Sequence, residues 1–142
     1  MTIEKLKQYT YLKKEIKDLE DKIENVNSYS GVNYGKIGVR GGGNKSDLVV
    51  AAVEKKDKLE IILRDRLQKA KDLLLEIEEW LDSIDDSYIR QCIDYHYIRG
   101  YSWQSTSNKL TGAMVDGAVL SNMITRFIKK SEVDENDENN MI

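Results

Sequence analysis

The chain has 142 residues, of which 40% are hydrophobic and 33% are charged, and it contains one cysteine and no proline. One cysteine excludes an intramolecular disulfide, and the lack of an apolar run of about 20 residues argues against a membrane-spanning helix. Because the sequence also shows no signal-peptide pattern, we expect a cytoplasmic protein that does not interact with membranes.

The charges are unevenly distributed along the chain. The formal net charge of -3 argues against a general polyanion binder. However, residues 86–130 contain six Lys or Arg and three Asp, whereas residues 131–142 contain five acids and no base. A basic segment therefore precedes an acidic one.

The first predicted element is a long helix over residues 3–27. Its apolar side chains alternate spacings of three and four residues, which places them on one stripe of a helix. Most of the other positions are Lys, Glu or Asp, as on a solvated face. The stripe consists of Tyr9, Leu12, Ile16, Leu19, Ile23 and Val26.

Residues 28–46 interrupt this pattern with six glycines, three basic residues and no acid. Each glycine disfavours helix by about 1 kcal/mol relative to alanine. A structureless loop of this length is unusual inside a compact domain. We expect either a flexible tether or a binding loop in which Lys36, Arg40 and Lys45 contact the DNA backbone or an acidic protein surface.

A second long helix is predicted from Asp47 to about Leu81, again with heptad spacing. Together the two helices predict a long arm over residues 1–84, which could fold as an antiparallel hairpin or pair with other copies of the chain. Leu73 and Leu75 widen the apolar face of the second helix, which favours a homo-oligomer. The side chains expected in the oligomer seam are Leu12, Ile16, Leu19, Ile23, Leu63, Leu67 and Leu74.

Residues 85–130 are predicted to form three short helices. Each begins after a residue whose side chain can accept hydrogen bonds from first-turn amides, and Gly100 ends the first of them. Since no segment shows a strand pattern, the sequence predicts an all-α fold. The acidic residues 131–142 are expected to be a disordered tail. The expected caps are Asp85 or Asp86, Ser102 and Asp116.

The last two of these helices have the size of a helix-turn-helix, whose second helix enters the DNA major groove. Ser, Thr and Asn can hydrogen-bond to base edges, Gly and Ala permit close approach, and Lys and Arg pair with phosphates. We therefore expect binding of duplex DNA. The expected contacts are Gly117, Ala118, Ser121, Asn122, Thr125, Arg126, Lys129 and Lys130.

The promoter-reading C-terminal domain of sigma factors and their phage relatives is similar to the stretch "YIRQCIDYHYIRGYSWQSTSNKL". The final helix of sigma-region-4-like proteins from phages of Gram-positive bacteria resembles "LTGAMVDGAVLSNMITRFIKK". Late-gene transcription activators of the ArpU/RinA kind carry a segment similar to "VRGGGNKSDLVVAAVEKKDKL". The resemblance implies an oligomeric, sequence-specific phage or prophage transcription regulator in a bacterial cell, with the host RNA polymerase as a further partner.

Four positions depart from the family pattern. Thr106 and Ser107 stand where an apolar residue and alanine are expected, which predicts a weaker core in that helix. Ser121 and Thr125 stand where relatives often carry cations, which predicts weaker non-specific DNA affinity.

Two alternatives to a transcription regulator stay open. One is the small terminase subunit of a phage packaging machine, although the usual order there places the DNA-binding helices before the oligomerising ones. The other is a protein-interaction factor that inhibits or adapts a host complex. The few cations on the last helix and the acidic tail favour this second alternative.

No set of side chains predicts catalysis, a metal or a cofactor. His96 has no second ligand at metal-site spacing and is expected to pack beside Tyr95 or Tyr97. Cys92 is expected to be a small buried side chain, and Trp103 to seal the small core. The segment "RGGGNKS" lacks the spacing of a phosphate-binding loop. We therefore expect that the protein is not an enzyme.

Overall fold

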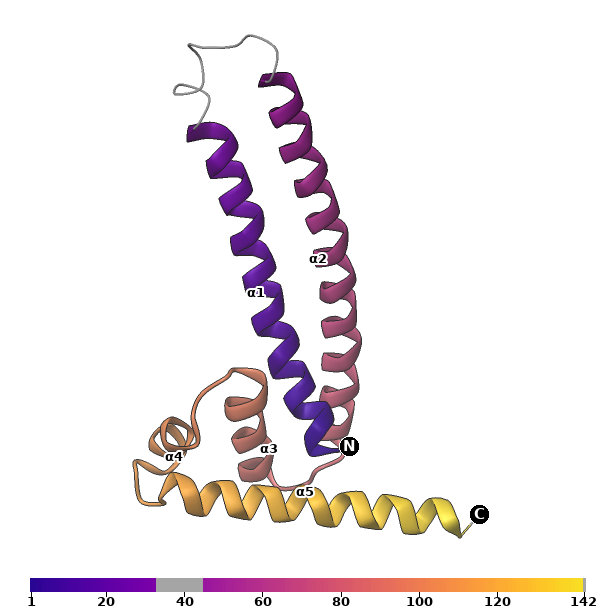
Figure 1. Ribbon diagram of the computed structural model, residues 1–142. Helices are drawn as coiled ribbons and strands as arrows, with labels where there is room; N and C mark the ends of the chain where they lie inside the picture. Colours follow the sequence, from indigo (N-terminus) through magenta and orange to yellow (C-terminus); the bar gives the residue numbers. More distant parts are fainter. Residues whose placement is uncertain (33–44, 142) are drawn as a thin grey trace. The chain divides into compact units, whose positions relative to one another are not determined.

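The computed structural model describes residues 1–32 and 45–141. Every regular element in these two ranges is helical and no strand occurs in them, which confirms the all-α fold class. No helix in this described part combines the length and apolar character needed to cross a membrane. The elements are α1 (Ile3–Val32), α2 (Lys45–Asp82), α3 (Ser87–Ile93), the π-helical turn η1 (Asp94–Ile98), α4 (Trp103–Thr111) and α5 (Gly117–Asn140) (Figure 1).

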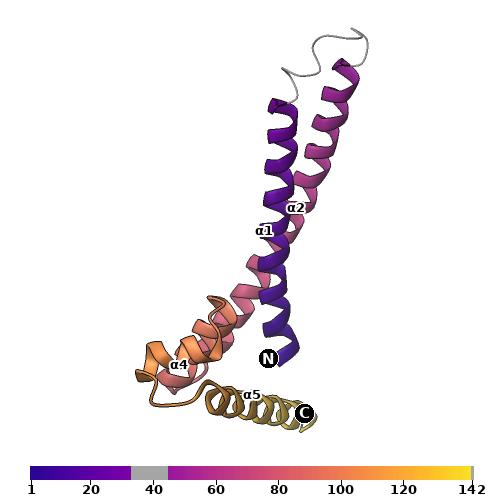
Figure 2. The ribbon, with the colours of Figure 1, turned by 60° about the vertical axis from the view of Figure 1, so that its left-hand side comes forward.

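The smaller of two compact units spans Leu12–Lys69 and contains most of α1 and α2. The two helices lie side by side in both views of the ribbon (Figures 1 and 2). Arg66 Nε donates a hydrogen bond to Glu15 Oε1 at 2.8 Å, from one helix to the other. This carboxylate is the main reason that the pKa of Arg66 is raised.

The heptad stripe of α1 is partly buried within the chain itself. Leu12 and Leu19 are buried, whereas Ile16 and Ile23 are only half-buried. Leu12 and Leu19 are thus already buried within one copy of the chain, and their expected place in a seam with another copy stays a prediction. The stripe of α2 also keeps half-buried members, which are Leu63, Leu67 and Leu74.

The larger unit comprises residues 1–11 and the chain from Ala70 onward. Lys5 forms an ion pair with Glu76, and Thr10 Oγ1 donates a hydrogen bond to the carbonyl of Tyr97 at 3.1 Å. These contacts join the first turns of α1 to the end of α2 and to η1. The core is drawn from α1, α2, α3 and α5 and includes Leu6, Ile77, Ile93, Leu120, Ile124 and Ile128, all fully buried.

The two long helices extend further than the sequence pattern predicts. Helix α1 continues to Val32 and α2 already begins at Lys45, so both ends of the predicted loop over residues 28–46 are helical. Lys36 and Arg40 lie outside the described residues, as does the side chain of Lys45.

The predicted caps of the three later helices are confirmed, with Asp86 rather than Asp85 before α3. Asp86 Oδ1 accepts hydrogen bonds from the amides of Tyr88 and Ile89 at 2.9 and 3.4 Å. Ser102 Oγ accepts from the amide of Ser105 at 3.1 Å. Asp116 Oδ1 accepts from the amide of Ala118 at 3.3 Å. Each cap satisfies amides that have no partner within their own helix.

The sequence pattern predicts one α-helix from Ser87 to Arg99, but the structure differs. Helix α3 continues into η1, where the Arg99 N–H donates a hydrogen bond to the Asp94 carbonyl at 2.9 Å. Gly100 then has a φ of 82°, in the left-handed region that glycine adopts without strain. Gly100 therefore ends the helical segment where the sequence predicts.

The acidic segment is helical, so the prediction of a disordered tail is wrong for residues 131–140. Helix α5 runs without interruption to Asn140, as both ribbon views show (Figures 1 and 2). No glycine or proline follows Gly117 in this helix, and a helix that is already nucleated extends at little cost. Glu135 also pairs with the Met1 amino group at 2.8 Å.

Candidate nucleic-acid interface

Helices α4 and α5 meet at a backbone-to-backbone contact at Gly117. A Cβ atom on this residue would lie 2.7 Å from the Gln104 backbone nitrogen and 2.9 Å from the Gln104 Cα. The amide of Gly117 donates a hydrogen bond to Gln104 Oε1 at 3.0 Å. Only glycine fits here, because every other residue would place its Cβ against backbone that cannot turn aside. The first turn of α5 is therefore fixed against α4.

The turn that precedes α5 is held by hydroxyl groups of α4. The Ser107 hydroxyl hydrogen-bonds to the Val115 carbonyl and lies 3.1 Å from Thr111 Oγ1. Gly112 and Ala113 both adopt positive φ, 63° and 68°, and reverse the chain between these contacts. The prediction that a polar residue at position 107 weakens the core is therefore wrong, because the serine ties the turn to the helix.

Thr106 behaves differently from its neighbour. It is fully buried, and within the described part of the chain its hydroxyl has no hydrogen-bond partner. An unsatisfied buried hydroxyl is unfavourable by about 1–3 kcal/mol. The predicted weakness of α4 therefore applies to this position.

Aromatic side chains join η1 to α4. The His96 ring stacks on Trp103, with centroids 3.7 Å apart and planes 18° apart, and Tyr97 meets both rings edge-on. The predicted packing of His96 beside Tyr97 is confirmed. Burial lowers the pKa of His96, and a hydrogen bond from Nδ1 to the Tyr101 carbonyl at 2.7 Å opposes that shift. His96 is therefore a packing residue and not a free titrating group.

The outward face of α5 differs from the predicted one at three positions. Gly117 is buried, which contradicts its predicted exposure, and Ser121 and Thr125 are half-buried. These three lie toward the side of the helix that packs on the core. The remaining predicted contacts are exposed, namely Ala118, Asn122, Arg126, Lys129 and Lys130.

Two apolar residues share that outward face and were not predicted from the sequence. Val119 is 58% exposed and Met123 is 40% exposed. Their apolar character suggests core, but Val119 directly precedes the buried Leu120 and Met123 directly precedes the buried Ile124. At about 100° per residue, that offset moves them to the edge of the buried stripe or beyond it. The angular position of Val119 and Met123 around the helix, relative to the buried residues, could have identified them as exposed.

The basic residues of α5 differ from Arg90 and Arg99, two arginines that lie earlier in the larger unit. No ion pair among the described residues involves Arg126, Lys129 or Lys130. By contrast, Arg99 Nε pairs with Asp94 at 2.7 Å. The guanidinium of Arg90 donates to the Ile84 carbonyl at 2.6 Å. The outward cations of α5 are therefore available to a partner, whereas these arginines stabilise the fold.

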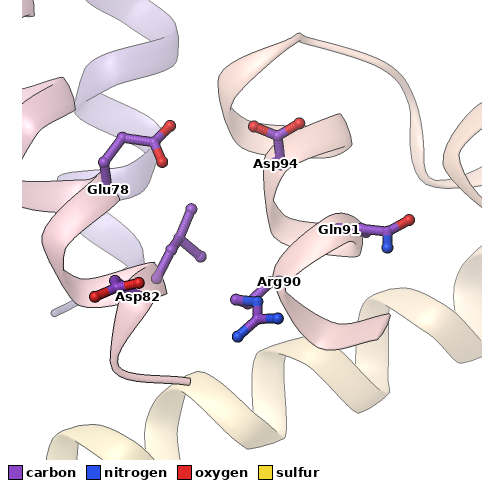
Figure 3. A pocket seen from close by; sticks show the side chains of 6 residues that line it. Glu78, Asp82, Arg90, Gln91 and Asp94 are labelled. Carbon is purple, nitrogen blue, oxygen red and sulfur yellow. The ribbon is translucent and has the colours of Figure 1, made fainter. Parts of the chain in front are cut away.

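Figure 3 shows the pocket between the end of α2 and α3, with a volume of about 270 Å³. Glu78 and Asp82 come from α2, Arg90 from α3 and Asp94 from the start of η1. Asp94 is paired with Arg99, and Arg90 is held by the carbonyl of the α2–α3 turn. With these two groups committed to the fold, we interpret the pocket as a groove between helices and not as a binding site.

Cys92 is fully buried on α3, as predicted. Burial raises the pKa of its thiol, which disfavours the reactive thiolate. Across residues 1–32 and 45–141 no group of three or more His, Cys, Asp or Glu side chains has an arrangement that could hold a metal ion.

No protein-family model, no curated protein and no solved structure matches this chain.

Proposed function

We propose that the protein binds duplex DNA through the outward face of α5, with α4 and α5 acting as a helix-turn-helix. The observation that carries this proposal is the set of exposed cations without ion pairs, Arg126, Lys129 and Lys130, on a helix fixed against α4 at Gly117. Between residues 103 and 130 the chain carries four basic residues and a single acid, Asp116, whose carboxylate caps α5. Between Gly117 and Lys130, α5 therefore carries no carboxylate that would repel a phosphate backbone.

The chemistry of this face divides along the helix. The first turns present Ala118 and Asn122, small and amide side chains that suit base edges in the major groove. The cations follow one to two turns later, where they can pair with phosphates. This order is the one that a helix inserted by its N-terminal end requires. Together with the resemblance to sigma-region-4-like proteins, it favours a phage or prophage transcription regulator.

Self-association through the long helices is part of this proposal. Ile16 and Ile23 on α1, with Leu63 and Leu67 on α2, stay half-buried along the seam between the two helices. A second copy of the chain could cover these edges and bring two α5 helices to one DNA site. Sedimentation at several protein concentrations would detect this self-association. A single monomeric species at all concentrations would contradict it.

The test of DNA binding is the salt dependence of affinity for duplex DNA. Each phosphate neutralised by a cation contributes about 0.9 to the slope of log K against log salt. We expect the Arg126→Ala, Lys129→Ala and Lys130→Ala triple variant to lose up to about 3 in that slope. Fluorescence anisotropy with labelled genomic fragments would measure it.

The matched control replaces three exposed lysines of α2 by alanine, Lys55, Lys58 and Lys71, which gives the same change in net charge. We expect this control to keep most of the wild-type slope, because the three cations of α5 are retained. Equal slopes in the α5 variant and the wild type would refute the proposal.

A further inference from the structure

The outward face of α5 carries a particular set of side chains in its first three turns. Val119, Asn122, Met123 and Arg126 are all exposed, and their spacings of three, one and three residues place them on one side of the helix. The positions that face the core are Leu120 and Ile124, which are fully buried, and Gly117. The outward set is therefore two apolar side chains around an amide, followed by a guanidinium.

This combination matches the major-groove edge of an A·T base pair. Thymine presents a 5-methyl group there, which apolar side chains contact, and adenine presents N7 and N6, which an asparagine amide can bind with two hydrogen bonds. Val119 and Met123 lie within one turn of Asn122, so all three can reach adjacent base pairs.

We propose that Val119 and Met123 contact thymine methyl groups beside an adenine bound by Asn122, so that the preferred duplex site contains adjacent A·T pairs. The inference deepens the proposed function and rests on it, since it assumes that α5 lies in the major groove. The expected base contacts Ser121 and Thr125 are half-buried, and the inference therefore assigns the base preference to Val119, Asn122 and Met123 instead.

Charge on the same face favours DNA over a protein as the occupant. Arg126, Lys129 and Lys130 continue the outward face directly beyond the apolar residues. In the part of α5 from Gly117 to Lys130 there is no acidic residue. Two exposed apolar side chains next to three cations fit a groove with methyl groups on its floor and phosphates on its walls.

The experiment begins with selection of duplexes from a random-sequence pool by the full-length chain. Each thymine of the enriched sequence is then replaced by uracil, which removes only the 5-methyl group. We expect about a fourfold loss of affinity at each contacted thymine, the value of one buried methyl group. In the Val119→Ala and Met123→Ala variants, one thymine position each should lose this sensitivity to uracil.

Val133→Ala is the matched control, because Val133 is 57% exposed on α5 but lies beyond the cations. It should leave affinity and uracil sensitivity unchanged. If replacing thymine by uracil leaves the affinity unchanged at every position while the salt slope persists, the inference is overturned and the proposed function stands.

Unchanged base preference in both apolar variants would also overturn the inference and indicate that the two side chains belong to a protein-binding surface. Failure to bind any duplex at low salt would overturn the inference together with the proposed function.

Discussion

The two halves of α5 share one backbone geometry but differ in what surrounds them. From Gly117 to Lys130, every three or four residues a position is buried against the rest of the larger unit, ending with Ile128. From residue 133 to 140 every side chain is exposed. The first half is thus stabilised by tertiary packing and the second mainly by its own hydrogen bonds. An uninterrupted helix can therefore contain segments of very different local stability.

Charge separates the same two halves. The first ends in Arg126, Lys129 and Lys130, and the second contains four acids, with a fifth acid, Glu132, directly before it. At about 1.5 Å per residue, the change of sign occurs within a single turn. Under the proposed function, the acidic half repels DNA and confines contact to the first half. The acids would then lower non-specific binding more than specific binding, since non-specific binding is almost wholly electrostatic.

The largest expected effect comes from removing core packing in the first half. Ile124 is fully buried, and Ile124→Ala should lower the free energy of unfolding by about 2–5 kcal/mol, through lost apolar contact and the cavity that remains. Val133→Ala, in the exposed second half, should change it by less than about 0.5 kcal/mol. Urea unfolding followed by circular dichroism would measure both. Similar losses in the two variants would contradict the division of α5.

A smaller loss is expected at the glycine contact between α4 and α5. Gly117→Ala would force a Cβ to within 3.0 Å of the Gln104 backbone, and such overpacking costs about 1–3 kcal/mol. The control Gly112→Ala meets no atom within 4 Å, so its cost should come only from its positive φ, about 1 kcal/mol. Both would be measured by thermal unfolding. A neutral Gly117→Ala would show that the two helices can separate freely.

The smallest expected effect concerns the acids of the second half. The Asp134→Asn and Asp137→Asn double variant should bind non-specific duplex roughly two- to fourfold more tightly at low salt, because exposed carboxylates repel phosphates only weakly through water. The control Asp18→Asn and Asp21→Asn changes the net charge equally, at exposed positions of α1. Equal gains in both variants would indicate a general effect of net charge and not a local one.

Sequence alone was sufficient for the starts of α3, α4 and α5 and for the core face of α5. Asp86, Ser102 and Asp116 are caps because their short side chains accept hydrogen bonds from amides that follow directly in the chain. Leu120, Ile124 and Ile128 follow the helical repeat, so their burial could also be predicted. Both signals are local, since they depend only on residues within about one or two turns.

The features that sequence reasoning missed depend on contacts between distant residues. Gly117 resembled an exposed glycine until its approach to Gln104, thirteen residues earlier, was known. Ser107 resembled a defect in the core, yet its hydroxyl meets the Val115 carbonyl. The acidic composition of residues 131–140 suggested disorder, but composition does not register that a packed helix already precedes them. Tertiary context decided all three.

Under the proposed function, DNA contacts the first half of α5 and not the second. Amide chemical shifts recorded by NMR during titration with a selected duplex would test it residue by residue in one experiment. We expect large shifts at Ala118, Asn122 and Arg126, with little change from residue 133 to 140. Shifts concentrated in the acidic half, or spread evenly along the helix, would contradict it.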